Sequence, residues 1–209
     1  MPQRKESKNN NMISITLENL INNIDAFKAG DRLLLSGKIY TARDEAHKRI
    51  VEGAKPFSLK NAAIYYCGPS PKKPNAVIGA CGPTTSSRMD NFTPFMLNEG
   101  VKVFIGKGPR APSINKAIAD FKAIYLTATG GVAALLSKTV TAAEVIAFED
   151  LGPEAIYELT VENRRDNKTS RQQQQWQHHC NGKRRLGRRL HYCFYQNYIY
   201  ESSDIGNAY

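Results

Sequence analysis

Short apolar segments alternate along this chain with segments of helical periodicity, and this alternation limits the folds open to it more than any other feature. Runs of apolar residues predict the strands, and apolar residues three and four apart predict the helices. We expect strands at 13–16, 32–41, 62–66, 76–80, 101–105, 123–127 and 144–148, and helices at 17–27, 42–51, within 86–97, at 113–121 and from 130 to 137. Alternating strands and helices with short connections are typical of a layered α/β domain.

The composition is that of a globular protein, with 209 residues, 41% of them hydrophobic and 23% charged. No run of about 18 apolar residues occurs, so a membrane-spanning helix is excluded. Residues 1–11 carry charges but no apolar segment, and we expect a disordered leader there without a secretory signal. Four cysteines without a CxxC pair argue against a disulfide scaffold. These features predict a soluble protein of the reducing cytoplasm.

The net charge of +10 is unevenly distributed. Residues 1–162 hold 20 Lys/Arg and 16 Asp/Glu, whereas residues 163–209 hold 9 and 3. This tail contains the only Trp, the run Gln172–Gln175 and five of the ten tyrosines, but few aliphatic residues and no regular period. We therefore predict a nearly neutral, enzyme-like body followed by a basic, low-complexity tail that is poorly ordered and adds little core.

The basic, Tyr-rich tail leaves open an alternative of a different class, a non-catalytic nucleic-acid-binding protein. Salt-sensitive RNA or DNA binding that is lost on truncation at Glu162 would distinguish this alternative from an enzyme. The tail also carries five potential metal ligands, and their spacing matches no zinc pattern. We expect no metal bound by this chain; the tail ligands are His178, His179, Cys180, His191 and Cys193.

Three polar clusters, at 41–44, 82–88 and 106–108, each follow a predicted strand, where open α/β sheets bind their ligands. In the middle cluster Thr84 and Arg88 are four residues apart, so we predict that they share a face at the N-terminus of a helix. An Arg beside hydroxyls and free N–H groups suits a carboxylate or a phosphate. The alternative is N-capping by Ser or Thr with a solvated Arg.

The other polar residues allow a functional and a plainer interpretation. Arg43 either binds a ligand or forms a surface ion pair of little weight with Asp44. Lys107, between two glycines, either approaches a ligand or is an exposed residue of a tight turn, and the P-loop spacing is absent. For His47 we favour a packed side chain over a catalytic one. Cys67 and Cys81 are interpreted as small buried thiols.

Four ordered blocks carry a resemblance to a known family. They are Ser36–Arg49, Gly82–Pro94, Gly100–Gly108 and Ala147–Ile156. Together they resemble the class I (iron–sulfur) fumarate hydratases, in their β subunit or C-terminal domain, over residues 13–162. The β subunits of L(+)-tartrate dehydratase share much of this layout, but the Arg-Met-Asp, Phe-Thr-Pro and Ile-Gly-Lys-Gly sequences are closer to fumarase.

This resemblance implies a single three-layer β/β/α "swivelling" domain at residues 12–162. It implies the β subunit of a two-subunit hydro-lyase that interconverts fumarate and L-malate, with L(+)-tartrate as the alternative substrate. The family's [4Fe-4S] cluster is held by three cysteines of the α subunit, and none of the four cysteines here matches them. We therefore expect this chain alone to bind no cluster and to be inactive, and αβ units to pair into a heterotetramer.

Carried over residue by residue, the resemblance places the contacts to a dicarboxylate substrate on five side chains. These are Arg43, Thr84, Thr85, Arg88 and Lys107. It assigns the role of general base to Thr84, with a proton relay or a hydrogen-bond donor to the substrate as the alternatives. A Thr hydroxyl is a weak base, so this role requires nearby cations such as Arg88 and Lys107.

The resemblance ends after Glu162. The family continues with Asn/Asp-Phe-Pro and an apolar strand, whereas here Asn163 is followed by Arg-Arg-Asp-Asn-Lys. We hypothesise a shift of reading frame just after Asn163, which translation of the other two frames would test. Loss of the family's strand is expected to leave an unpaired sheet edge.

Overall fold

The computed structural model describes residues 12–128 and 131–162, and the backbone of 194–196. The strands are β1 (Met12–Thr16), β2 (Arg32–Thr41), β3 (Ala63–Tyr65), β4 (Val103–Gly106), β5 (Ile124–Thr127), β6 (Val140–Ala147), β7 (Ile156–Val161) and β8 (Phe194–Gln196). The α-helices are α1 (Leu17–Asn22), α2 (Asp44–Val51), α3 (Thr93–Asn98), α4 (Pro112–Asp120) and α5 (Ala133–Leu136). The 3-10 turns are η1 (Ile24–Ala26), η2 (Ser86–Met89), η3 (Ser137–Thr139) and η4 (Glu149–Glu154).

The eight strands form one mixed sheet in the order β3-β4-β5-β8-β2-β7-β6, with β1 paired to β2. Strand β2 is ten residues long and pairs with four neighbours: β1 and β8 near its start, β7 and β3 towards its end. Because β2 also pairs with β3, the strands β2, β3, β4, β5 and β8 close into a ring. The pairings β2–β3, β3–β4 and β4–β5 are all parallel. The carboxyl ends of these four strands therefore lie at one edge of the sheet.

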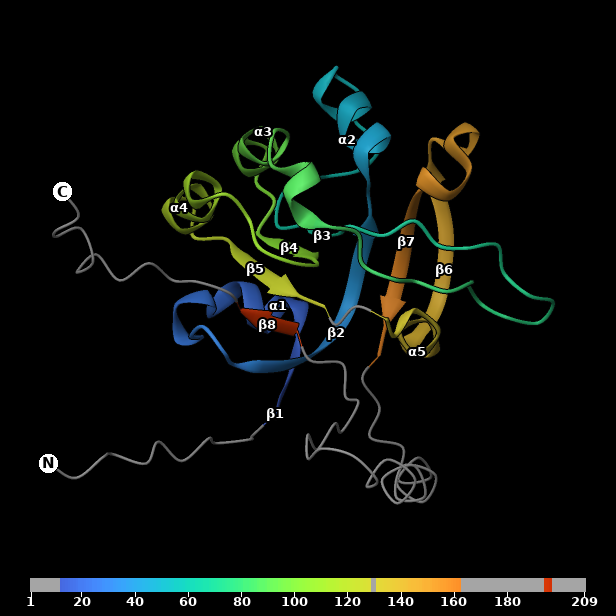
Figure 1. Ribbon diagram of the computed structural model, residues 1–209, viewed down its shortest axis with the longest axis horizontal. Coiled ribbons are helices and arrows are strands. Elements are labelled where there is room, and N and C mark those ends of the chain that lie inside the picture. The colour runs from blue at the N-terminus through green and yellow to red at the C-terminus, as the bar shows by residue number, and fades with distance from the viewer. Residues whose placement is uncertain (1–11, 129–130, 163–193, 197–209) are drawn as a thin grey trace, which may run out of the picture.

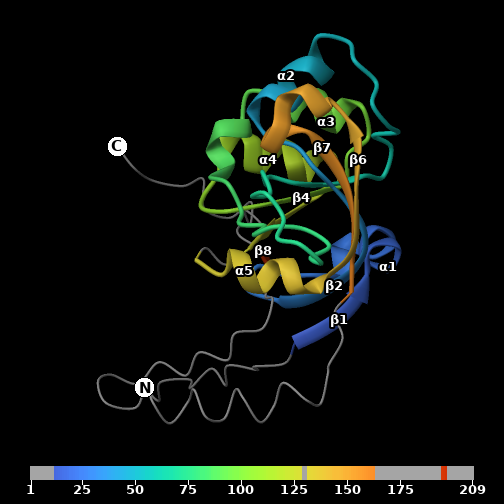
Figure 2. The same cartoon turned by 90° about the vertical axis from the view of Figure 1, so that its right-hand side faces the viewer.

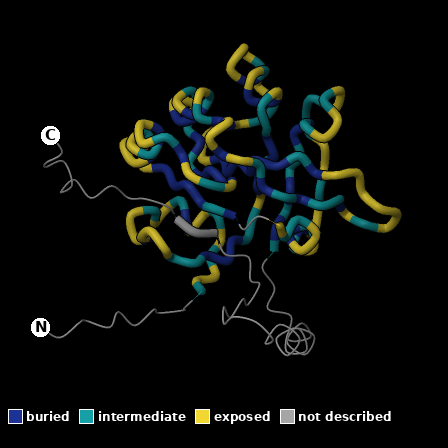
Figure 3. The backbone as a smooth tube through the Cα atoms, viewed as in Figure 1, coloured by how far each residue is buried: buried dark blue, intermediate teal, exposed yellow. Residues whose placement is uncertain are grey.

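Side chains of β3, β4 and β5 alternate between two buried cores, as expected for parallel strands covered on both faces. In β3, Ala63 and Tyr65 face the first core, whereas Ile64 faces the second. The first core lies between these strands and the layer of β2, β6 and β7. The second lies beneath helices α2, α3 and α4. The predicted three-layer β/β/α domain is thereby confirmed (Figures 1 and 2), and buried residues lie in its interior (Figure 3).

Most predicted elements occur within a few residues of their expected bounds, but the strand predicted at 76–80 is wrong. There the backbone bonds across its own loop instead of to the sheet. Ser70 N–H donates to the Ala80 carbonyl oxygen, and Ala80 N–H donates to the Ser70 hydroxyl. A Cβ at Gly79 would lie 1.9 Å from the Ser70 carbonyl oxygen, so the two limbs of the loop are in close contact.

The C-terminal part of the sheet differs most from the expectation. Strand β6 begins at Val140, four residues earlier than predicted, and β7 was not predicted. Strand β8 lies inside the tail and pairs with both β5 and β2, so for these three residues the prediction of an unordered tail is wrong. Its pairing covers sheet edges that we expected to be open. The leader and the rest of the tail lie outside the described residues, so the predictions for them, the frame shift included, stay predictions.

The described helices are short, and none of them is long and apolar enough to cross a lipid bilayer.

Candidate functional site

The predicted site residues gather at the carboxyl ends of the parallel strands β2, β3 and β4. Arg43 follows β2 and is the N-cap residue of α2. Lys107 follows β4 directly. The segment 83–86 lies between them, because Cys67 pairs with Pro83 in an antiparallel bridge and Thr85 pairs with Lys107 in a parallel one. The clusters at 41–44 and 106–108 follow strands, as predicted, but the cluster at 82–88 does not, because no strand forms at 76–80. Its two isolated bridges place it beside the other two clusters.

Thr84 is held in this segment by its backbone alone. Its N–H donates to the Tyr66 carbonyl oxygen at 2.6 Å, and its carbonyl oxygen accepts from Lys107 N–H at 3.1 Å. These bonds make the backbone continue the sheet, so the predicted helical face shared by Thr84 and Arg88 is wrong. Only one 3-10 turn, η2, follows. Arg88 lies within that turn.

The threonine hydroxyls do not cap a helix. Thr85 precedes η2, but its side chain accepts no capping hydrogen bond. Thr84 is half-buried and Thr85 is exposed. Neither hydroxyl bonds to another residue of the described part of the chain, so the N-capping interpretation is not supported and both hydroxyls are available to a ligand.

The two arginines are held by carboxylates from other segments. Arg88 pairs with Asp44 through Nε at 3.0 Å and Nη2 at 2.9 Å. The expected Arg43–Asp44 pair forms at 3.9 Å, but Glu154 is a nearer partner of Arg43, at 3.2 Å. Sequence reasoning missed Glu154, although it lies in the fourth block of the resemblance. Asp44 and Glu154 thus hold the guanidinium groups of Arg43 and Arg88 close to each other at this edge of the sheet.

Lys107 extends from a tightly packed loop. Its side chain is exposed and pairs with no acidic residue of the described part, whereas its N–H donates to the Ser86 hydroxyl at 2.9 Å. The Tyr125 hydroxyl lies 2.7 Å from both Ser86 Oγ and the Gly108 carbonyl oxygen. Burial raises the pKa of Tyr125 to about 12, so it remains a donor. A Cβ at Gly106 would lie 2.0 Å from Ser86 Oγ, which leaves room only for glycine.

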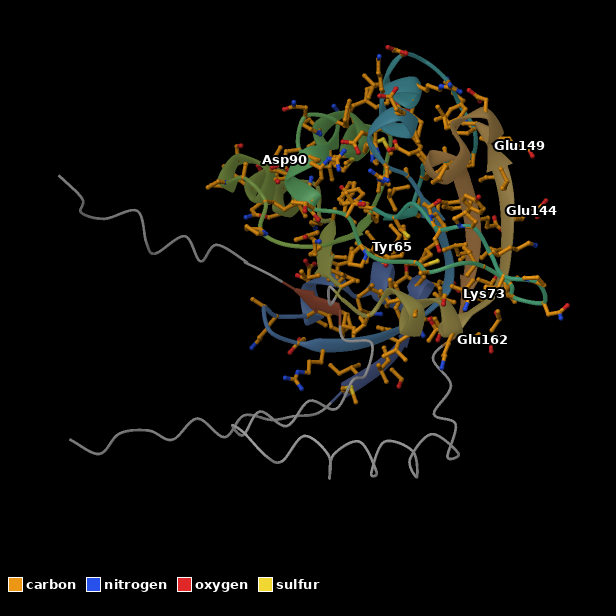
Figure 4. The ribbon with its side chains drawn as sticks, turned by 45° about the vertical axis from the view of Figure 1, so that its right-hand side comes forward. Tyr65, Lys73, Asp90, Glu144, Glu149 and Glu162 are labelled. Carbon is orange, nitrogen blue, oxygen red and sulfur yellow. The ribbon has the colours of Figure 1, made fainter. Side chains whose placement is uncertain are left out.

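A buried charged cluster beneath the site was not predicted. The Arg110 side chain has no exposed area, and it donates to Asp90 at 2.6 Å, to the Tyr66 hydroxyl at 3.0 Å and to the Thr93 hydroxyl. Asp90 also accepts from Ala111 N–H at 3.0 Å. Asp90 follows η2 and lies beside α3 and α4 (Figure 4). The cluster therefore anchors the segment that leads from the site into the helices.

His47 is a packed residue, as expected. Its Nδ1–H donates to the Arg43 carbonyl oxygen at 2.8 Å, and its ring contacts those of Tyr66 and Phe92. Its Nε2 is buried without a partner among the described residues. Burial, reinforced by the Arg110 charge, lowers its pKa from 6.5 to about 4 despite the opposing effects of the Arg43 carbonyl and Asp44. The ring is neutral at pH 7.

This buried neutral histidine predicts a loss of stability in mild acid. Below pH 6.5 the unfolded chain binds a proton that folded His47 takes up only near pH 4. The free energy of unfolding should therefore fall by roughly 1–3 kcal/mol as the pH decreases from 6.5 towards 4. Urea denaturation across this range checks it. In His47→Asn, which keeps an N–H donor, this part of the pH dependence should be absent; an unchanged slope would contradict the assignment.

The described residues do not fit an iron–sulfur cluster. They include two cysteines, Cys67 and Cys81, which are both buried. Contact with Cys81 and burial raise the pKa of the Cys67 thiol, which opposes the thiolate that a metal needs. No group of three His, Cys, Asp or Glu side chains in these ranges could hold a metal ion. The tail ligands considered above lie outside them.

Comparisons with known proteins agree with the resemblance. A family model described as the fumarase C-terminus matches residues 1–166. A Methanocaldococcus jannaschii protein named "Putative L(+)-tartrate dehydratase subunit beta" is 41% identical over 150 residues, which are 67% of this chain and 77% of that protein. "Fumarate hydratase 1, mitochondrial" of Leishmania major is 37% identical over 63% of this chain, and "Fumarate hydratase class I, anaerobic" of Escherichia coli is 30% identical over 70%. The matches cover 25% and 28% of these two proteins, so the chain spans about a quarter of their length.

Proposed function

The chain belongs to the fumarase C-terminus family, and from this membership we propose that it is the β subunit of a two-subunit hydro-lyase that hydrates fumarate reversibly to L-malate. The name of the M. jannaschii relative, a subunit beta, supports a partner subunit. We propose that this α subunit holds the [4Fe-4S] cluster, and that two αβ units associate.

One observation carries the proposal: three cationic residues and two hydroxyls that bond to no described residue lie at the carboxyl edge of β2, β3 and β4. Arg43 and Arg88 are linked through Asp44, and Lys107 is paired along the backbone with Thr85. A dicarboxylate carries two negative charges, which Arg and Lys side chains bind by charge-assisted hydrogen bonds. The site therefore suits a small dicarboxylate better than a neutral ligand.

The same side chains suit the chemistry of dehydration. Malate loses the C2 hydroxyl and a proton from C3, and water and fumarate are formed. As the C3 proton leaves, negative charge gathers on the adjacent carboxylate, where Arg and Lys groups stabilise it. We assign the proton to Thr84. Its oxygen, held as an alkoxide by the charges of Arg88 and Lys107, takes the C3 proton and becomes a hydroxyl. It then returns this proton to the departing C2 hydroxyl, which leaves as water, and the alkoxide is restored.

L(+)-Tartrate is the second candidate substrate. The M. jannaschii relative has 41% identity and a length similar to that of this chain, and its name specifies tartrate. Tartrate has the same two carboxylates as malate and one more hydroxyl, so the cationic groups described above would bind it equally. The partner subunit would then determine which dicarboxylate is accepted.

An anaerobic activity assay tests both candidates. The chain is co-expressed with the α-type reading frame beside its gene, iron and sulfide are reconstituted, and fumarate absorbance is followed from L-malate, with L-tartrate in parallel. We expect malate turnover that requires both chains. Turnover of tartrate alone would move the assignment to tartrate dehydratase. Activity that appears only after a family-like C-terminal strand is restored would support the frame shift.

A further inference from the structure

Turn η4 is fixed onto helix α2, far from it in sequence. Arg49 of α2 pairs with Asp150 through Nη1 at 2.8 Å and Nη2 at 2.5 Å. The Arg49 guanidinium also lies 5.2 Å from the centre of the Phe148 ring, just before the turn. The turn therefore connects the end of β6 to the beginning of β7 and lies beside α2 in both views of the molecule (Figures 1 and 2).

The last residue of this turn, Glu154, connects the helix to Arg43. One carboxylate oxygen accepts from Glu45 N–H at 3.1 Å, in the first turn of α2. The other lies 3.2 Å from Arg43 Nη2. The two side chains are 22% and 23% exposed, so water screens this pair only in part. Glu154 is thus bonded to backbone on one side and presents its charge to Arg43 on the other.

A glycine, Gly68, also limits the space around Arg43. A Cβ at Gly68 would lie 3.0 Å from both Cδ and Nη1 of Arg43, and 2.8 Å from the Pro153 carbonyl oxygen. Arg43 therefore packs closely against the Gly68 backbone while its Nη2 reaches Glu154. Its Nε is buried without an acceptor among the described residues. The guanidinium is fixed while donors remain for a ligand.

Asp44 does not replace Glu154 in this role. Both oxygens of Asp44 face Arg88, at 3.0 and 2.9 Å, and the carboxylate lies 3.9 Å from Arg43. We propose that Glu154 is a positioning residue, which orients Arg43 so that its remaining N–H groups receive a substrate carboxylate. This inference rests on the proposed function, because it supposes that Arg43 binds the substrate.

The direction in which KM changes distinguishes a positioning role of Glu154 from an effect of its negative charge alone. Removing a negative charge near a dianionic substrate should by itself lower KM. If Glu154 positions Arg43, Glu154→Gln should instead raise KM about tenfold or more with a smaller change in kcat, because the guanidinium loses its fixed orientation. Asp150→Asn, which loosens the turn, should change KM in the same direction by less.

Glu149→Gln is the matched control. Glu149 begins the same turn, is exposed, and pairs with no basic residue in the described ranges (Figure 4). The Glu149→Gln substitution changes the charge of the turn by the same amount as Glu154→Gln but leaves the contact with Arg43 intact. The KM of this variant should therefore stay within about twofold of the wild-type value. A fall of KM in both variants would overturn the proposal in favour of a charge effect.

A second measurement needs no activity. In ¹⁵N-labelled full-length chain, the Arg43 Nε–H resonance, assigned by its absence in Arg43→Lys, should be resolved in the wild type and in Glu149→Gln and averaged in Glu154→Gln. An unchanged resonance in Glu154→Gln overturns the positioning role. If the complex turns over neither malate nor tartrate, even after a family-like C-terminal strand is restored, the proposed function fails, and the positioning role of Glu154 in substrate binding with it. An active wild type with an unchanged KM in Glu154→Gln removes Glu154 alone.

Discussion

Replacing Thr84 by alanine is expected to lower malate turnover by the assembled enzyme by about two to four orders of magnitude, because general acid–base groups contribute on that scale. The chain should still fold. The bonds that hold Thr84 in the sheet use its N–H and carbonyl oxygen, which alanine retains. The hydroxyl itself bonds to no described residue. Steady-state kinetics with purified complex, together with the denaturation curve of the subunit, measure both effects.

Two neighbouring substitutions serve as controls. Thr84→Ser keeps a hydroxyl at the same place and should retain most of the turnover. Ser87→Ala removes an exposed hydroxyl from η2, which we place in neither catalysis nor binding, and should leave kcat unchanged. Near-normal turnover in Thr84→Ala would exclude Thr84 as the base. The assignment would then be restricted to substrate binding by the surrounding cations.

The central strands could be predicted because their local sequence decides them. Residues 32–41 contain the apolar run Leu33–Leu35 followed by Ile39 and Tyr40, and β2 has the predicted bounds. Residues 76–80 are also mostly apolar, but Ala80 finds its hydrogen-bond partners on the nearby loop residue Ser70, and no strand forms. The early start of β6 is set by pairing with β7, which the small residues of β6 do not indicate.

For the candidate site, the sequence could propose a set of residues but not their geometry. The resemblance proposed the side chains, and the parallel order of β2, β3 and β4 explains why these residues lie at one edge of the sheet. Which carboxylate holds which arginine depends on contacts between distant segments. Arg88 and Asp44 are 44 positions apart, and Glu154 reaches Glu45 across 109. No periodicity in the sequence encodes such pairs, and the same holds for the buried Arg110.

Replacing Arg110 by methionine is expected to cause the largest loss of stability, about 3–5 kcal/mol in the free energy of unfolding. The side chain is fully buried, and its three partners, Asp90, Tyr66 and Thr93, would each lose a charged donor. Unpaired buried polar groups bear their full desolvation cost, and an unpaired carboxylate bears the most. Urea denaturation of the full chain, followed by circular dichroism, measures the difference.

A second substitution distinguishes the cost of the unpaired Asp90 charge from the cost of the lost Arg110 packing. Asp90→Asn in the Arg110→Met background removes the uncompensated charge and leaves an oxygen for Ala111 N–H, so it should recover part of the stability. Lys116→Met removes a cation from an exposed i,i+4 pair with Asp120 and should change stability by no more than about 0.5 kcal/mol. If Arg110→Met costs no more than Lys116→Met, the buried cluster does not stabilise the fold. A large loss with no recovery would show instead that the guanidinium acts through packing against the Tyr66 and Tyr125 rings.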